Sequence, residues 1–246
     1  MADNNEEPKA KPAAPPTPVH IGGETLADRI APHVKKIMVA VILIAVIVTI
    51  VLAFRWRKHV GQEKQTEKLA KVLDEGRAPV GPETLMPGQP ASTEKRFTTA
   101  KERAIAMLDS MAKAGAEGTP TFKGSLLLDA GRTDEAIASY RKGTTAKGLD
   151  GVIAREGLGI ALETKAIAEA DAGARQKLLE EALATFTAMQ PDEAGPRRAY
   201  ALYHQGRLQQ EYFHKPAEAK ALFEKAKELG ASTELPDLIE RRLAAL

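Results

Sequence analysis

An unbroken apolar segment runs from Ile37 to Phe54, and Thr49 is its only polar residue. A helix of this length, 18 residues, measures about 27 Å and nearly matches the roughly 30 Å hydrocarbon core of a membrane. Valine and isoleucine would cover every face of it, whereas a helix of a soluble protein keeps one polar face. Trp56 follows, and its amphipathic ring suits the interface between lipid and water. The sequence therefore predicts a transmembrane helix over residues 37–56.

Two other interpretations of this segment fit less well. A core helix of a soluble protein keeps a polar face, which this segment lacks. A cleaved signal peptide would need a short leader and a cleavage site of small residues, which Arg55-Trp56-Arg57 does not offer. The orientation stays open, because the positive-inside rule compares flanking basic residues and five precede the segment while six follow it. They are Lys9, Lys11, Arg29, Lys35 and Lys36 before it, and Arg55, Arg57, Lys58, Lys64, Lys68 and Lys71 after it.

Changes in composition divide the rest of the chain into three regions. Residues 1–36 form a disordered and juxtamembrane tail, in which we expect the polar, proline-rich residues 1–23 to be disordered and Thr25–Ile30 to form a short helix. Residues 57–92 begin with helical periodicity and end in a Pro- and Gly-rich linker from Gly76 to Ser92. Residues 93–246 carry apolar stripes at helical spacing. Since only 4% of residues are aromatic, close-packed helices are favoured over sheets, and we expect an all-α fold behind a single transmembrane helix.

Charge and motifs exclude several classes of function. A formal net charge of +2 with interspersed signs does not suggest nucleic-acid binding. The chain has no cysteine, which rules out disulfides and thiol chemistry. Neither a phosphate-binding loop nor the H-E-x-x-H or G-x-S-x-G motif occurs, and the histidines are scattered. We therefore expect no enzyme activity, no cofactor and no metal site.

A small residue followed four positions later by an aromatic one recurs along the helical region. Each such pair follows a helix that carries a glycine, and the spacing resembles helix–turn–helix units of about 34 residues. The two halves of the middle unit are further apart, so both of its helices should be lengthened around Gly173. The three units comprise Gly124, Leu127, Gly131, Ala136 and Tyr140; Gly159, Ala182 and Phe186; and Gly206, Ala219 and Phe223.

The edges of these units are also marked in the sequence. Ala104 and Leu108 are typical of the second helix of a degenerate first unit, and residues 235–246 of a closing helix. Proline has no N–H to lose at the first position of a helix. Helix starts are therefore expected at Pro120, Pro196, Pro216 and Pro236.

The Gly124–Leu127–Gly131–Ala136–Tyr140 set resembles the tetratricopeptide-repeat family, and the resemblance covers residues 93–246. It implies a solenoid of helix hairpins that binds other proteins, with the first helix of each hairpin lining the concave face. The residue mixture there suits extended or partly unfolded peptide. The predicted protein-binding groove consists of Ser125, Leu128, Asp129, Ile160, Glu163, Tyr203, Arg207 and Gln210.

The order of parts narrows the resemblance further. A short tail, one span ending in Arg55-Trp56, a helix and irregular repeats resemble the membrane-anchored ancillary subunit of the Sec translocon in Gram-negative bacteria. That family implies an inner-membrane anchor, periplasmic repeats, and translocon components, chaperones or secreted chains as partners. The linker and the proline-rich tail depart from its usual pattern. Two alternatives stay open, an assembly factor or scaffold for another envelope complex and a cytoplasm-facing adaptor; the oligomeric state stays open as well.

Overall fold

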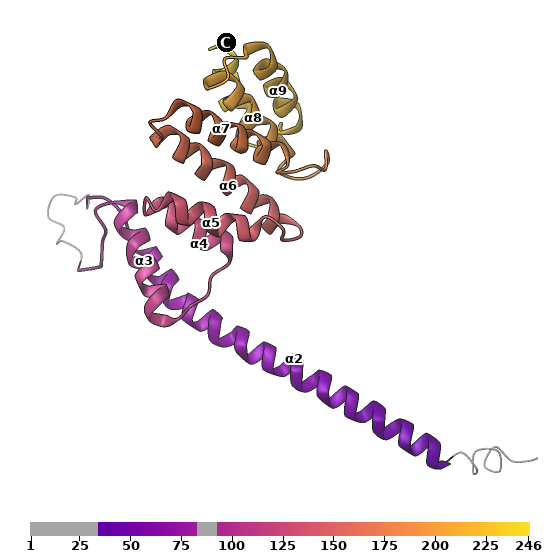
Figure 1. Cartoon of the computed structure of the whole chain (residues 1–246). Helices are drawn as coiled ribbons and strands as arrows, with labels where there is room; N and C mark the ends of the chain where they lie inside the picture. The colour runs from indigo at the N-terminus through magenta and orange to yellow at the C-terminus, as the bar shows by residue number, and fades with distance from the viewer. Residues whose placement is uncertain (1–33, 83–92) are drawn as a thin grey trace, which may run out of the picture. The chain divides into compact units, whose positions relative to one another are not determined.

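The computed structural model describes residues 34–82 and 93–246 and is all-helical, as predicted (Figure 1). Within these ranges there is no strand, and Val80 and Phe97 form an isolated parallel bridge. Residues 1–33 of the predicted tail and residues 83–92 of the predicted linker lie outside the described residues. The last three residues of the predicted tail are helical, because α2 begins at Val34. Contacts divide the chain into two units, residues 1–59 and 60–246, which are considered separately below. The helices are α2 (Val34–Arg77), α3 (Ala100–Ala114), α4 (Pro120–Asp129), α5 (Thr133–Gly143), α6 (Leu149–Ala168), α7 (Ala172–Thr187), α8 (Arg198–Glu211), α9 (Pro216–Leu229) and α10 (Leu235–Leu243).

The described part of the first unit is the apolar portion of α2. Its stretch Met38–Arg57 has a mean hydropathy of 2.9, and none of it is buried within the protein. Among the described residues, this is the one helix long and apolar enough to cross a membrane, and it is displaced by one residue from the predicted span. The hydroxyl of Thr49 donates to the carbonyl oxygen of Ala45 over 2.8 Å. Thr49 is the single polar residue between Met38 and Phe54, and its hydroxyl is thus satisfied within the helix itself.

The linker was predicted to begin at Gly76, but α2 continues to Arg77. The physical reason is close packing against α3, because a Cβ on Gly76 would lie 2.8 Å from the methyl carbon of Met107. Here glycine lets two helices approach rather than ending one. The helical region likewise begins later than residue 93, at Ala100, where the N-cap Thr99 accepts a hydrogen bond from the backbone N–H of Glu102.

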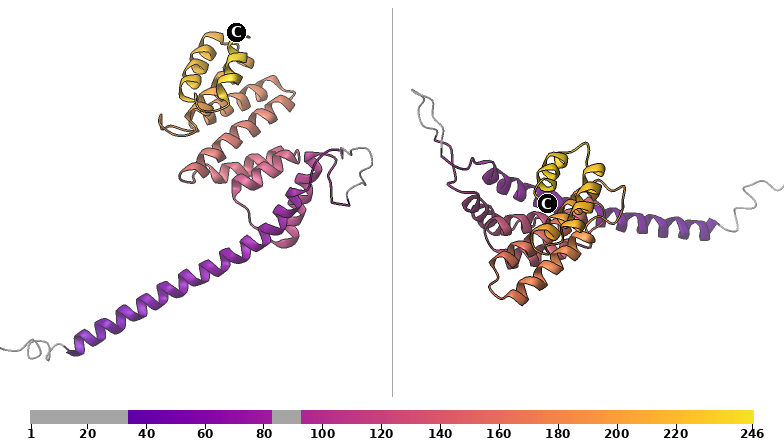
Figure 2. Two further views of the ribbon diagram at one scale, coloured as in Figure 1. Left: turned by 180° about the vertical axis from the view of Figure 1, so that it is seen from behind. Right: turned by 90° about the horizontal axis from the view of Figure 1, so that it is seen from above.

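In the second unit, helices α4 to α9 form three successive pairs, α4/α5, α6/α7 and α8/α9 (Figures 1 and 2). The three pairs lie where the glycine and aromatic spacing predicts them. The middle pair has the longest helices of the three, 20 residues in α6 and 16 in α7, as its wider spacing predicts. The turn between α4 and α5 uses Gly131 at φ 78°, a left-handed conformation that residues with a Cβ adopt at a cost. Helices begin at Pro120, Pro216 and beside Pro236.

The helix start predicted at Pro196 is wrong, because α8 begins at Arg198. Two turns precede it: the N–H of Gly195 donates to Asp192 and the N–H of Arg198 donates to Gly195. These turn hydrogen bonds hold Pro196 outside the helix, and the glycine beside it favours such a turn.

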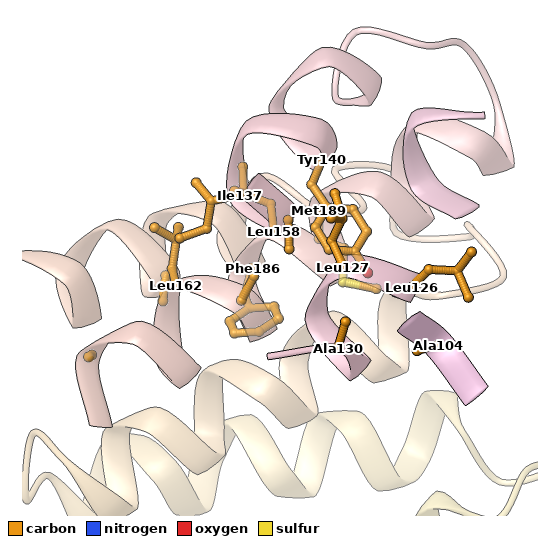
Figure 3. Close-up of a cluster of buried hydrophobic side chains, with 14 of the residues drawn as sticks. Ala104, Leu126, Leu127, Ala130, Ile137, Tyr140, Leu158, Leu162, Phe186 and Met189 are labelled. Atoms are coloured by element: carbon orange, nitrogen blue, oxygen red, sulfur yellow. The ribbon is translucent and has the colours of Figure 1, made fainter. Parts of the chain in front are cut away.

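Two hydrophobic cores hold the second unit together. The larger core extends from Val72 of α2 through α3 to α8. Among its buried side chains are Tyr140, Leu162, Phe186 and Met189 (Figure 3). The smaller lies among α8, α9 and α10 around Phe223 and Ile239. Helix α8 contributes to both cores, so the last hairpin is joined to the others through its first helix.

Candidate protein-binding surface

The same glycine-to-ring contact occurs in each of the three hairpins. The first helix carries a glycine, and the aromatic ring of the second helix packs against it. An added Cβ would lie 2.8 Å from Tyr140 at Gly124, 2.6 Å from Phe186 at Gly159 and 2.8 Å from Phe223 at Gly206. Ala136, Ala182 and Ala219, each four residues before the ring, are fully buried. These contacts set the distance between the helices of a pair and therefore the side of the first helix that faces outward.

On α4, two of the three predicted groove residues are exposed. Ser125 and Asp129 face solvent, whereas Leu128 is half-buried and packs against the larger core. The hydroxyl of Tyr140 lies behind this surface, within hydrogen-bonding reach of Ser125. Burial raises the pKa of Tyr140 to about 12, so this hydroxyl stays protonated and neutral.

On α6, Ile160 is half-buried and Glu163 is buried, and the Glu163 carboxylate is engaged within the protein. It accepts two hydrogen bonds from the guanidinium of Arg207 on α8, one of them 2.5 Å long, and a third from the hydroxyl of Tyr212. The Glu163 side chain is 8% exposed and the Arg207 side chain 15%. Two predicted groove residues therefore neutralise each other and hold α6 to α8.

The pKa of Arg207 reflects this pairing. Burial by itself would lower it, but the hydrogen bonds and the negative charge of Glu163 outweigh burial and raise the pKa above its ordinary value. The guanidinium is thus held as a cation by its partner. An incoming ligand would have to displace Arg207 before pairing with Glu163, which costs the energy of a buried ion pair.

A second group of charges joins α6 to the segment before α8. Arg197 donates to Glu156 over 2.5 Å, and His204 lies 3.5 Å from the same carboxylate. The His204 ring stacks on Phe186 with centroids 4.6 Å apart. Arg197 also lies over the ring of Tyr200, at 4.1 Å from its centroid. Burial would raise the pKa of Glu156, but hydrogen bonds from His204 and Arg197 outweigh it and lower the pKa.

The remaining groove candidates, Tyr203 and Gln210, lie on α8, next to residues that pair with α10. Gln210 donates through its side-chain amide to the carbonyl oxygen of Arg242, 3.3 Å away. Glu211, its neighbour, forms an ion pair with the Arg242 guanidinium. Tyr203 is half-buried with its ring near Phe223, at 6.0 Å between centroids. Ion pairs thus link α6 to α8 and α8 to α10 in sequence.

The predicted groove therefore has two parts of different character. The α4/α6 part presents Ser125, Asp129 and the partly exposed Ile160, whereas ion pairs already occupy the α6/α8/α10 part. Sequence reasoning missed Ile153, which is 37% exposed and lies two turns before Ile160 on the same helix face. It also missed Glu156, although a seven-residue spacing before Glu163 on one face was visible in the sequence.

No family model, curated protein or solved structure matches this chain.

Proposed function

We propose that this chain is a single-pass membrane protein whose helical domain is a tetratricopeptide-like module for binding other proteins. The observation that carries this proposal is the glycine-to-ring contact repeated in three consecutive hairpins. Hairpins that share one internal packing geometry stack in a regular way, and a stacked array presents its first helices on a common face. Such faces bind extended segments of other proteins.

The α4/α6 part is the receptor surface in this proposal. Ser125 and Asp129 offer hydrogen-bonding groups, while Ile153 and Ile160 offer apolar contact. The mixture suits an extended or partly unfolded peptide, which offers a polar backbone together with apolar side chains. The ion pairs of Glu163 with Arg207 and of Glu211 with Arg242 hold the neighbouring helices in place. A surface ordered beforehand loses less entropy on binding.

The segment Met38–Arg57 would anchor this domain to the bacterial inner membrane. We place the repeats in the periplasm, near the Sec translocon and its chaperones, on the order of tail, span, Arg55-Trp56, helix and repeats. The mechanism would be many weak contacts with emerging chains, and tethering would raise their effective concentration. No catalytic step is part of this function.

Reporter fusions after Leu246 test this orientation. One fusion carries an enzyme that is active only in the periplasm, and the other carries one active only in the cytoplasm. The proposal expects activity from the periplasmic reporter alone. Activity from the cytoplasmic reporter alone would contradict it and favour a membrane-docked adaptor, which the near-equal flanking charges allow.

Partner stoichiometry separates this role from that of an assembly factor. Crosslinking of the full chain in cells, followed by identification of the products, should yield several transient partners, among them translocon components and chaperones. One partner recovered at equal amounts with this chain would instead indicate a scaffold for a single envelope complex.

A further inference from the structure

The cleft between the end of α2 and helix α3 is rich in lysine. It encloses about 790 Å³, within the size range of sites for small molecules. Five lysines and three carboxylates line it, which leaves a formal charge of +2. The lysines are Lys64, Lys68 and Lys71 from α2, Lys95 from the segment before α3, and Lys113 from α3.

Internal pairing neutralises only part of this charge. Lys71 lies 3.6 Å from Glu67, and Lys95 forms an ion pair with Glu75. In contrast, Lys68 donates to the carbonyl oxygen of Gly115 over 3.2 Å, which leaves its charge uncompensated. Across the part of the chain that the structure describes, Lys64 and Lys113 have no ion pair.

Chain connectivity limits how far Lys64 can lie from the predicted lipid surface. Lys64 follows Arg57, the last residue of the apolar stretch, by seven positions. Seven residues span at most about 25 Å even when fully extended. Arg55, Arg57 and Lys58 at the end of that stretch would enrich anionic lipids locally, since juxtamembrane basic residues attract them. An anionic headgroup is therefore the ligand held at the highest effective concentration near the cleft.

We propose that this cleft binds the phosphate headgroup of an anionic phospholipid through Lys64, Lys68 and Lys113. The inference rests on the membrane anchoring in the proposed function but not on the protein-binding surface. Because Lys64 and Lys113 come from different helices, a bound headgroup would tie α3 to the end of α2. It would thereby stabilise the part of the domain nearest the membrane along the chain.

Lysine acetylation of the full chain in lipid nanodiscs tests the proposal. Two disc types are compared, one of phosphatidylcholine alone and one containing phosphatidylglycerol, and the acetylation rate of each lysine is read by mass spectrometry. We expect the rates of Lys64 and Lys113 to fall at least threefold in the phosphatidylglycerol discs. Lys147 and Lys177, which are exposed and lie outside the cleft, should react equally in both.

The variant Lys113→Glu separates binding in the cleft from a general effect of the charged surface. If the headgroup sits between the helices, Lys64 loses its protection in this variant. If phosphatidylglycerol merely lowers lysine reactivity near the disc, Lys64 stays protected, and the proposal is overturned. The matched control Lys147→Glu, which makes the same change of charge, should leave Lys64 protected.

Three further outcomes would overturn the proposal. Equal rates in both disc types would exclude an anionic headgroup while leaving the membrane anchor intact. Protection in phosphatidylcholine discs by added inorganic phosphate would assign the cleft to a free anion. A chain that does not enter discs of either kind would contradict the anchoring itself, and the headgroup site with it.

Discussion

Phe186 of α7 packs face-on against Gly159 of α6, so closely that a Cβ on the glycine would lie 2.6 Å from the ring. Phe186 is fully buried and also stacks on His204 of α8. One side chain therefore joins the two helices of the middle hairpin and the first helix of the next. Phe186 is therefore one of the contacts that connect the middle hairpin to the last one.

Replacing Gly159 by alanine should destabilise the domain by about 1–3 kcal/mol, because the added methyl group forces the Phe186 ring to move within a packed core. The matched control is Gly173→Ala in the first turn of α7, where the nearest atom would be 3.4 Å away. That change should be neutral or stabilise by about 0.5–1 kcal/mol, since alanine favours helix. Urea unfolding of the full chain in detergent, followed by circular dichroism, measures both. Equal midpoints would show that the contact does not position the helices.

Removing the carboxylate of Glu163 should cost about 3 kcal/mol, because the buried Arg207 then keeps only its longer ion pair with Glu211, 3.5 Å away. The single variants Glu163→Leu and Arg207→Met should each be strongly destabilised. The double variant Glu163→Leu with Arg207→Met should recover much of the loss, because no buried charge remains unpaired. The same urea titration measures this cycle. Losses that simply add in the double variant would contradict a direct pair.

Stability should depend on pH through Glu156. Its folded pKa lies below its ordinary value of 4.5, so the folded state holds its proton less tightly than the unfolded chain does. Its contribution is therefore complete above about pH 4.5 and is lost as the pH falls through the lowered folded pKa. We expect Glu156→Gln to be less stable than wild type at pH 7 and the difference to shrink toward pH 3. A difference that grows on acidification would contradict this sign.

Charge placed in the apolar part of α2 should release the chain from the membrane. Val46 and Ile50 lie near the middle of Met38–Arg57, where an arginine costs about 2.5–3.5 kcal/mol. Val46→Arg combined with Ile50→Arg should move the chain into the carbonate-soluble fraction, whereas Val46→Leu with Ile50→Leu should leave it in the membrane pellet. Retention of the arginine variant would indicate that this helix is not the anchor.

Local patterns were enough to predict the three helix pairs, though not every helix boundary. The spacing of Gly159 before Phe186 and of Gly206 before Phe223 placed the hairpins, because contacts within a hairpin follow from short-range helical geometry. The end of α2 was missed because Gly76 serves there in close packing with Met107 rather than as a breaker. Helix period alone does not separate these two roles of glycine.

The ion pairs could not be predicted in the same way. Glu163 and Arg207 are 44 residues apart, and Glu156 and Arg197 are 41 apart. Their meeting depends on the register between consecutive hairpins, which depends on the whole set of packed side chains. The eight groove residues were predicted from their positions in the repeat alone. Those positions do not reveal that Glu163 and Arg207 pair with each other.

Site-specific photo-crosslinking in cells tests the protein-binding surface most directly. A photoreactive amino acid is placed at Ile153 on the α4/α6 surface or at Leu229 near the end of α9; these side chains are 37% and 44% exposed. Both sites are exposed and apolar, but only Ile153 belongs to the proposed surface. We predict protein crosslinks from Ile153 that are absent or at least fivefold weaker from Leu229. Equal crosslinking at the two sites, or crosslinks from Leu229 alone, would contradict the proposed binding surface.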